Sequence, residues 1–297
     1  MSERTVAITS LRGFAAHGWL GLTLIAIFWP LDWLLPGPRT QWCFFPLWLG
    51  YSLAVDALAL RRRGSSLLAR DWRRYLGLFA ASALAWWLFE AVNLRTQNWH
   101  YVGRGLFSDW QYAIFASFAF STVMPAVFGT AELIASLRFV NRLGRGPLIR
   151  PDRLTSALFF FTGLIMLALL FAWPRIFFPF VWLAVFFFIE PLNLWLGNPS
   201  LAVHTGAGDW RPVVALCLGA LVCGLFWEMW NYFSYPYWTY SVPGVSFLHV
   251  FEMPLLGYLG YLPFALELCA LYHFVAGLLS RRRDAYLCVV PDAAVPQ

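Results

Sequence analysis

Two glutamates with matching surroundings are the residues of this chain best placed to do chemistry. Glu90 and Glu228 each lie nineteen residues after the aspartate of an Asp-Trp-Arg triplet, which begins at Asp71 in one case and at Asp209 in the other. Both fall near one end of a strongly apolar segment and beside tryptophans. A carboxylate at the centre of a membrane-spanning helix costs roughly 2.5–3.5 kcal/mol. Two such residues in matching places predict one site that is built from two halves.

An asparagine follows each acid by three residues, Asn93 after Glu90 and Asn231 after Glu228. Residues three apart share a helix face, so each amide is expected to hydrogen-bond its carboxyl group and fix the rotamer. Burial against the tryptophans should keep both carboxyl groups protonated at neutral pH. A neutral carboxylic acid in a dry aromatic pocket is suited to general acid catalysis. The alternative is that each glutamate is a polar residue in a helix contact.

Glu252 is a third candidate catalytic acid, at the start of the last apolar segment and two residues before Pro254. It has no acidic counterpart in the first copy of the pattern, where Ser121 and Thr122 lie nearby. Such an asymmetry suits catalysis, in which one acid donates a proton and another group stabilises or accepts charge. The alternative is that Glu252 caps the N-terminus of a helix.

Aromatic residues follow each glutamate and supply candidate substrate-binding groups. The two elements are Trp99-His100-Tyr101 and Trp238-Thr239-Tyr240. Trp and Tyr are favoured at membrane interfaces, so one interpretation is an aromatic belt. The other is a wall of π faces, which would stabilise a carbocation and hold an extended isoprenoid chain. The candidate substrate-binding residues are Asn93, Trp99, His100, Tyr101, Asn231, Trp238, Tyr240 and His249.

Metal and cofactor sites find little support in the sequence. His100 and His249 could add metal ligands to the glutamates, but no two histidines lie three or four residues apart. The five cysteines show neither metal-binding spacing nor a disulfide framework. The sequence also lacks a glycine-rich phosphate loop, a nucleophile elbow and a dinucleotide fingerprint. We therefore predict neither a bound metal nor a cofactor.

The composition indicates what kind of element must hold these residues. Of the 297 residues, 60% are hydrophobic and only 12% are charged, against about 25% charged in a soluble domain. The mean hydropathy is +0.63, and the composition predicts an integral membrane protein. All 21 basic residues are arginines, which fall in short segments between the apolar stretches. We therefore attribute the net charge of +6 to arginines that set the membrane topology, and not to a nucleic-acid-binding surface.

Eight apolar stretches are long enough to cross a membrane. Helix is the expected structure for all of them, because lipid cannot satisfy the hydrogen bonds of an open backbone. The predicted fold class is an all-α integral membrane protein with about eight transmembrane helices. Pro254 and Pro263 in the last stretch predict a kink or a break. The stretches are residues 13–35, 42–60, 75–94, 110–137, 155–174, 176–197, 212–232 and 246–279.

The arginines set the expected orientation. With the N-terminus placed inside, seventeen arginines fall on the inner side and four on the outer side, and an excess of arginine is typical of cytoplasmic loops. We therefore expect a multi-pass protein of a bacterial inner (plasma) membrane, with both termini cytoplasmic. The four outer arginines are Arg39, Arg95, Arg104 and Arg175.

The repeated pattern extends beyond the two acidic motifs. Trp-Pro closes the first and fifth stretches, and Phe-Phe-Pro opens the second and sixth. An acid follows a tryptophan by eight residues in both of the latter, at Asp56 and Glu190. Residues 1–140 and 150–284 are therefore predicted to be two four-span repeats, with a short cytoplasmic tail at 285–297. An even number of spans gives both repeats one orientation, which implies a pseudo-two-fold axis along the membrane normal.

Four further acids lie toward the inner ends of the predicted spans. Asp56 and Glu190 could pair with loop arginines or form a second polar cluster. Glu132 and Glu267 are expected to be structural. The sequence assigns none of the four a role in the predicted site.

The second copy of the pattern resembles the small integral-membrane lycopene cyclases of carotenoid biosynthesis. Those enzymes have two homologous multi-span halves, a Trp-acid pair at a helix end and a Trp-x-aromatic element after it. A proline-acid-acid motif opens their next helix. The residues that match are Trp227-Glu228, Asn231, Trp238-x-Tyr240, Gly244 and Phe251-Glu252-Met253-Pro254.

The resemblance covers spans two to four and six to eight, and it implies roles for the acids. Glu228 looks like the first acid of the family, with Glu90 as its equivalent in the other half. Glu252 lies where the second motif falls, but here the proline follows a single acid instead of preceding two. The halves also have four predicted spans, against about three in that family.

These observations predict a membrane-embedded, cofactor-free isomerase or cyclase that acts on a polyene, isoprenoid or carotenoid-like lipid. Glu228 or Glu252 would protonate an alkene, and Glu90 and the aromatic loops would shape the pocket and stabilise the cation. The runner-up is a proton-coupled transporter or lipid-binding bundle, and a third hypothesis is a structural partner in a larger complex. A cavity open to lipid would favour the enzyme, and a water-filled route to both faces would favour transport. The oligomeric state stays open.

Overall fold

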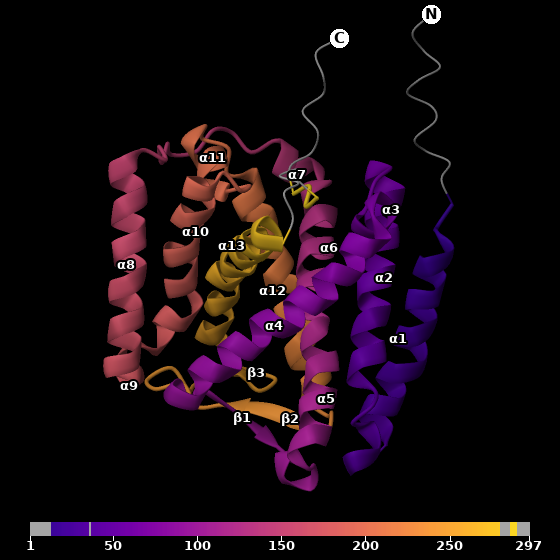
Figure 1. Cartoon of the computed structure of the whole chain (residues 1–297). Helices are drawn as coiled ribbons and strands as arrows, with labels where there is room; N and C mark the ends of the chain where they lie inside the picture. The colour runs from indigo at the N-terminus through magenta and orange to yellow at the C-terminus, as the bar shows by residue number, and fades with distance from the viewer. Residues whose placement is uncertain (1–12, 36, 280–285, 290–297) are drawn as a thin grey trace, which may run out of the picture.

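A computed structural model describes residues 13–35, 37–279 and 286–289 of the chain. Within them, long helices run between the two ends of the molecule, and a small β-ribbon lies at one end (Figure 1). The predicted inner positions of Arg4, Arg12, Arg281, Arg282 and Arg283 fall outside the described residues, and of the predicted tail only residues 286–289 are described.

The segment predicted as the first repeat contains long helices joined by short turns. Its elements are α1 (Ala16–Leu34), α2 (Phe44–Arg63), α3 (Leu67–Arg70), α4 (Trp72–Thr96), α5 (Asp109–Ser121), α6 (Val123–Ala135) and α7 (Arg138–Asn141), with 3-10 turns at Gly37–Thr40 and Arg104–Leu106. Gly64 ends α2 in the left-handed conformation that favours glycine, at φ 73°. Asp71 accepts hydrogen bonds from the N–H groups of Arg73 and Arg74 and so caps α4.

The segment predicted as the second repeat has the same order of long helices. Its elements are α8 (Arg153–Ala172), α9 (Pro174–Phe177), a 3-10 helix at Phe178–Trp182, α10 (Ala184–Leu196), α11 (Leu201–Gly206), α12 (Arg211–Asn231), a 3-10 helix at Leu255–Gly260 and α13 (Tyr261–Leu279). Asp152 caps α8 by accepting a hydrogen bond from the Thr155 N–H. Asp209 precedes α12 and accepts one from the Arg211 N–H.

Five helical segments are long and apolar enough to cross a membrane, and a bent pair makes a sixth candidate. The five are Trp72–Thr96, Asp109–Ala135, Arg153–Ala172, Arg211–Asn231 and Leu255–Leu279, and the pair is Pro174–Trp182 with Ala184–Leu196, bent by 41°. They overlap six of the eight predicted spans. The other two, residues 13–35 and 42–60, form α1 and α2, which are not among these candidates. His17 and Asp32 lower the apolarity of α1, and Asp56 and three terminal arginines lower that of α2.

Two short β-ribbons depart from the predicted all-helical fold. β1 (Trp99–Val102) pairs antiparallel with β2 (Tyr237–Tyr240), and β3 (His249–Val250) pairs with β4 (Met253–Pro254). The predicted span 246–279 therefore begins with a hairpin, and its α-helix starts only at Tyr261. The alternating aromatic residues of both Trp-x-Tyr elements fit strands, in which every second side chain points to the same side.

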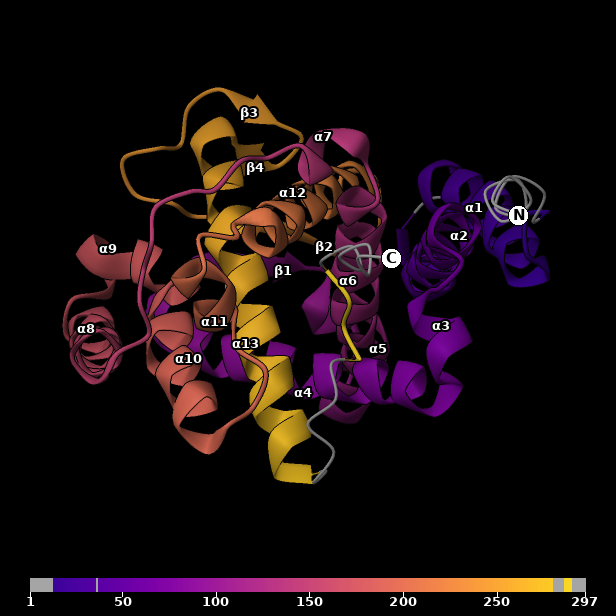
Figure 2. The same ribbon diagram turned by 90° about the horizontal axis from the view of Figure 1, so that it is seen from above.

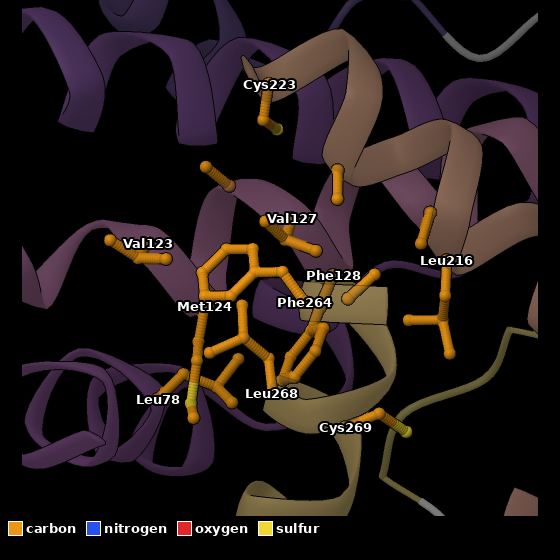
Figure 3. Close-up of a cluster of buried hydrophobic side chains, with 14 of the residues drawn as sticks. Leu78, Val123, Met124, Val127, Phe128, Leu216, Cys223, Phe264, Leu268 and Cys269 are labelled. Carbon is orange, nitrogen blue, oxygen red and sulfur yellow. The ribbon is translucent and has the colours of Figure 1, made fainter. Parts of the chain in front are cut away.

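The core lies where α4, α6, α12 and α13 meet, with α1 and α2 on one flank and α8 on the other (Figure 2). The rings of Phe128 and Phe264 pack there among aliphatic side chains (Figure 3). α6 and α12 come close because Gly219 has no side chain. A Cβ at Gly219 would lie 2.9 Å from the Ala131 backbone nitrogen.

The bend before α10 is held by an acid on α13. Glu267 is 0% exposed, and its Oε1 accepts a hydrogen bond from the Val185 N–H over 3.1 Å. A helix that begins inside a bundle leaves its first N–H groups without partners, and this carboxyl group satisfies one of them. Glu267 therefore stabilises the broken segment.

Residues 286–289 pack against the end of the bundle opposite the β1–β2 ribbon (Figure 1). The Tyr286 hydroxyl donates to the Leu67 carbonyl oxygen over 2.8 Å. The Cys288 N–H donates to Glu132 Oε1 over 2.7 Å, and the same carboxyl group forms an ion pair with Arg70. Glu132 thus fixes this segment and α3 to α6.

Asp56 and Glu190 have similar surroundings, ten residues before a serine. The Ser66 hydroxyl donates to Asp56 Oδ2 over 2.7 Å, and the Ser200 hydroxyl donates to Glu190 Oε1 over 2.8 Å. In both cases a backbone N–H two residues further on donates to the same carboxyl group. The sequence leaves open whether these acids pair with loop arginines or form a polar cluster. In the structure each acid forms a local polar cluster, which fixes the turn before the next long helix.

Candidate functional site

A cavity of about 450 Å³ lies beside the β1–β2 ribbon, between residues of both predicted repeats. Small-molecule sites commonly measure roughly 300–1,000 Å³. Residues of α4, α5 and the ribbon line the cavity together with residues of the Phe178–Trp182 turn, α12 and α13. The wall is rich in aromatic residues, which include Trp86, Trp99, Tyr101, Trp238, Tyr240 and Tyr261.

The ribbon presents one aromatic face to the cavity. Trp99 lies opposite Tyr240 and Tyr101 lies opposite Trp238, and all four line the cavity. Opposed residues and residues two apart share a face of a sheet, so His100 lies on the other face, where it is exposed. Four predicted substrate-binding residues therefore come together, and His100 does not join them.

Three donors converge on one oxygen of Glu90. The indole nitrogens of Trp86 and Trp99 donate to Oε1 over 3.0 and 2.9 Å. The Tyr101 hydroxyl donates to the same oxygen over 2.6 Å. All three donors line the cavity, whereas Glu90 is not among the described residues that do. Its carboxyl group therefore lies one layer behind the wall.

Glu228 has the corresponding place in the other half of the site, with different partners. The hydroxyls of Tyr240 and Tyr261 each donate to its Oε1 over 2.6 Å. The glutamate is 0% exposed, and no described residue hydrogen-bonds its Oε2. Trp238 Nε1 donates to the Tyr240 oxygen over 2.7 Å and so fixes that ring.

A glycine explains why the two acids have different donors. Gly224 precedes Glu228 by four residues, the position at which Trp86 precedes Glu90. A Cβ at Gly224 would lie 2.4 Å from the ring of Tyr261, so the missing side chain makes room for that tyrosine. An indole therefore donates in one half and a phenol in the other.

Asn93 and Asn231 hold the ribbon and not the carboxyl groups. Their Nδ2 atoms donate to the carbonyl oxygens of Trp99 and Trp238 over 2.8 and 2.7 Å, respectively. Each Oδ1 also accepts a backbone N–H of the same loop. The predicted contact with the glutamates is therefore wrong, because the buried backbone beyond each helix needs both a donor and an acceptor, and the amide supplies them.

Glu252 and His249 lie in the β3–β4 hairpin. His249 is exposed and Glu252 is half-buried in the turn between the strands. Neither is among the described residues that line the cavity, although Met253 of the same hairpin is.

The chemical groups at the cavity are carboxyl, phenol and indole. In the part of the chain that the structure describes, no three His, Cys, Asp or Glu side chains gather closely enough to bind a metal ion. The five cysteines are all free thiols. The side chains that are present can exchange protons and offer π faces to a ligand.

The tyrosines of the ribbon stay neutral. Burial raises the pKa of Tyr101 and of Tyr240 well above the ordinary value, and the charge of the adjacent glutamate raises each pKa further. Each hydroxyl can therefore donate a hydrogen bond or transfer a proton, but its deprotonated phenolate form is unfavourable.

Tyr261 and Trp182 are site residues that the sequence pattern does not identify as such. Tyr261 donates to Glu228, and Trp182 stacks on Trp99 with ring centroids 5.8 Å apart. A signal for Tyr261 exists at Gly224, because the glycine leaves a gap beside the acid that another side chain must fill. Which residue fills it depends on how α13 packs against α12.

Comparison of the chain with protein-family models, with curated proteins and with solved structures found no match. A fold alone does not define a function, so the function has to be argued from the site. That site is an aromatic cavity with two carboxyl groups behind its wall.

Proposed function

We propose that this protein is a membrane-embedded, cofactor-free isomerase or cyclase that acts on an isoprenoid or carotenoid-like lipid. Glu228 is the general acid that supplies a proton to an alkene. The aromatic wall and Glu90 stabilise the resulting carbocation, and a carboxylate takes a proton back. This is the kind of activity that the resemblance to the small integral-membrane lycopene cyclases implies.

The observation that carries the proposal is the placement of two carboxyl groups behind the wall of one apolar cavity, each hydrogen-bonded to a tyrosine of that wall. An alkene is apolar and a weak base, and its protonation by a carboxylic acid is favoured where water is excluded, a condition that a fully buried glutamate meets. A carbocation beside the wall would face the rings of Trp99 and Trp238, whose π electrons attract positive charge.

Equivalent local structures support two parallel four-helix repeats, at residues 1–140 and 150–284. The asparagines after the two glutamates make equivalent hydrogen bonds, and so do Asp56 and Glu190. The ribbon pairs the tryptophan of each Trp-x-Tyr element with the tyrosine of the other. A two-fold axis through the ribbon, along the membrane normal, would produce that pairing.

The proposed setting is a bacterial inner (plasma) membrane, which the chain crosses eight times. α1 and α2 are counted because they run beside the longer apolar helices (Figure 1) and because Asp32 and Asp56 are only 0% and 1% exposed. The arginine-rich turns around α3 and α7 lie at the end opposite the ribbon. That distribution supports a cytoplasmic location for these turns and for both termini.

The second candidate is a lipid-binding protein or a proton-coupled transporter, which the same apolar cavity favours. Such a protein would bind the polyprenoid and release it unchanged, and its glutamates would exchange protons with water. The enzyme is preferred because phenol hydroxyls, which can reach a ligand, connect the cavity to the buried carboxyl groups.

The proposal predicts a new product in cells that make lycopene or another linear polyprenoid and express this protein. Glu228→Gln keeps the size of the side chain but removes its transferable proton. It should lower product formation by about 100-fold or more, while the protein stays folded in the membrane. Chromatography and mass spectrometry of pigments and lipids measure the product.

Glu190→Gln is the matched control. Glu190 is almost as buried, at 2% exposed, but it lies in α10, accepts hydrogen bonds from the turn at α11 and is not among the described residues that line the cavity. Its variant should form product close to the wild-type level. Unchanged product from Glu228→Gln would remove Glu228 from the mechanism, and polyprenoid binding without any wild-type product would favour the second candidate.

A further inference from the structure

The surface of the cavity carries tyrosine hydroxyls, and the carboxyl groups lie behind them. Tyr101, Tyr240 and Tyr261 line the cavity, whereas Glu90 and Glu228 are not among the described residues that do. Each hydroxyl lies 2.6 Å from a glutamate oxygen. A ligand in the cavity therefore meets a phenol before it meets a carboxyl group.

We propose that the tyrosines, and not the glutamates, exchange protons with the ligand. Tyr240 and Tyr261 pass a proton from Glu228 to the alkene, and Tyr101 passes a proton from the resulting cation to Glu90. This assignment rests on the proposed function, and it names the groups that touch the reacting carbons.

The first step balances in atoms and charge. The O–H bond of Tyr240 or Tyr261 breaks while the π electron pair of the alkene forms a C–H bond to that proton. For this transfer the hydroxyl turns from Glu228 Oε1 to the alkene, so that the same phenol oxygen accepts and takes the proton of Glu228 Oε1, 2.6 Å away. The tyrosine ends neutral, Glu228 ends as a carboxylate, and the neighbouring carbon of the ligand carries the positive charge, which an internal double bond can attack to close a ring.

The second step runs through Tyr101 in the opposite direction. The Tyr101 oxygen takes a proton from the carbon next to the cation, and the electron pair of that C–H bond forms the new double bond. The hydroxyl proton of Tyr101 passes to Glu90 Oε1, which lies 2.6 Å away. Proton exchange with water then returns Glu90 and Glu228 to their starting states.

The different surroundings of the two acids give the transfer its direction. Glu90 is half-buried, and three donors converge on one of its oxygens. Glu228 is 0% exposed, has two hydroxyl donors, and has one oxygen without a partner among the described residues. We therefore assign the more deeply buried Glu228 as the proton donor of the relay and Glu90, with its three donors, as the acceptor.

The tyrosines suit a relay because they do not become charged. Burial raises the pKa of Tyr101 and of Tyr240 well above the ordinary value, so each must receive a proton as it gives one away. Tyr240 also accepts a hydrogen bond from Trp238 Nε1 over 2.7 Å, which holds its oxygen in place at the cavity. Tyr261 comes from another element and reaches the same Glu228 oxygen, so the two tyrosines can replace one another.

The test compares Tyr240→Phe, Tyr261→Phe and the double variant in the full-length protein, with lycopene and squalene as probes. Tyr51→Phe is the matched control, because Tyr51 is a buried tyrosine whose hydroxyl hydrogen-bonds to Thr130 over 2.9 Å, and it is not among the described residues that line the cavity. Turnover is measured in nanodiscs, binding by quenching of tryptophan fluorescence, and proton transfer by deuterium uptake from heavy water into the product.

Each single variant should lose about tenfold or less in turnover, and the double variant about 100-fold or more, with deuterium uptake lost in parallel. The dissociation constants should stay close to wild type. Tyr101→Phe should instead raise the share of alcohol products, because a cation whose proton is not removed is captured by water.

Three outcomes would overturn the assignment. Near-normal turnover by the double variant would mean that Glu228 reaches the ligand directly, and the proposed function would still stand. A loss of binding as large as the loss of turnover would mean that the tyrosines only position the ligand. The absence of any wild-type product from both probes would overturn the relay together with the proposed function.

Discussion

At the residue scale, the acids of this protein differ chiefly in what donates to them. Glu90 and Glu228 receive indole and phenol donors, and Asp56 and Glu190 receive a serine hydroxyl and a backbone N–H. Asp32 of α1 is 0% exposed, and neither of its oxygens has a partner among the described residues. A buried polar group without a partner costs free energy, which the rest of the fold must offset.

Asp32→Asn is therefore expected to stabilise the protein at pH 8, by about 1–3 kcal/mol, because an amide cannot ionise and is easier to bury than a carboxylate. Denaturant titration in detergent micelles measures the free energy of unfolding. Asp109→Asn serves as the control, since Asp109 is 98% exposed and the loss of its ion pair with Arg104 should cost less than about 1 kcal/mol. A less stable Asp32→Asn variant would show that the carboxylate has a stabilising partner.

Removal of the Asn231 amide, in contrast, should destabilise the protein. Asn231 is 0% exposed and both donates to and accepts from the backbone of Trp238. Asn231→Ala leaves those two backbone groups without partners, so the free energy of unfolding should fall by about 1–3 kcal/mol. Asn141→Ala, at an exposed position on α7, should change it little. Equal stability of the two variants would contradict the role given to Asn231.

At the element scale, two contacts join the halves of the site. The ribbon links the loop after α4 to the loop after α12, and α6 packs against α12 in the centre of the bundle. The ribbon sets the positions of the aromatic wall, and the helix contact sets the distance between the elements behind it. The cavity therefore depends on both contacts.

Gly219→Ala should weaken the contact between α6 and α12. The added Cβ would lie 2.9 Å from the backbone nitrogen of Ala131 and 3.0 Å from its Cα, so the helices must separate. The expected loss of unfolding free energy is about 1–3 kcal/mol. Gly77→Ala in α4 is the matched control, because no heavy atom lies within 4 Å of its added Cβ, and alanine favours a helix more than glycine does. A loss of stability in Gly77→Ala equal to that in Gly219→Ala would argue against the close-packing explanation.

At the scale of the whole molecule, the sequence predicts the long helices well and their connections poorly. Apolar runs of spanning length have one structure open to them in lipid, so six predicted spans coincide with helical candidates. The ribbon is not predicted, because Trp99 and Tyr240 are far apart in the chain and strand pairing depends on tertiary contacts. The contact between Tyr261 and Glu228 is not predicted either, because it depends on how α13 packs against α12.

The distribution of arginines between the two ends of the molecule predicts its orientation in the membrane. The turns that contain α3, α7 and α11 lie at one end, and the ribbon and the cavity lie at the other (Figure 1). Arginines are concentrated at the first end, and membrane proteins keep such residues in the cytoplasm. The cavity should therefore lie at the outer side of the membrane, where it would draw its lipid from the outer leaflet.

Cysteine labelling tests this orientation at two exposed positions, His100 on the ribbon and Asn141 on α7. In a protein whose five cysteines have been replaced by alanine, His100→Cys should react with a membrane-impermeant maleimide added to intact spheroplasts. Asn141→Cys should react only after the membrane has been opened, because the reagent cannot reach the cytoplasm. Gel-shift analysis of the labelled protein measures both reactions. The reverse order would contradict the proposed orientation and would place the cavity, with its two glutamates, on the cytoplasmic side.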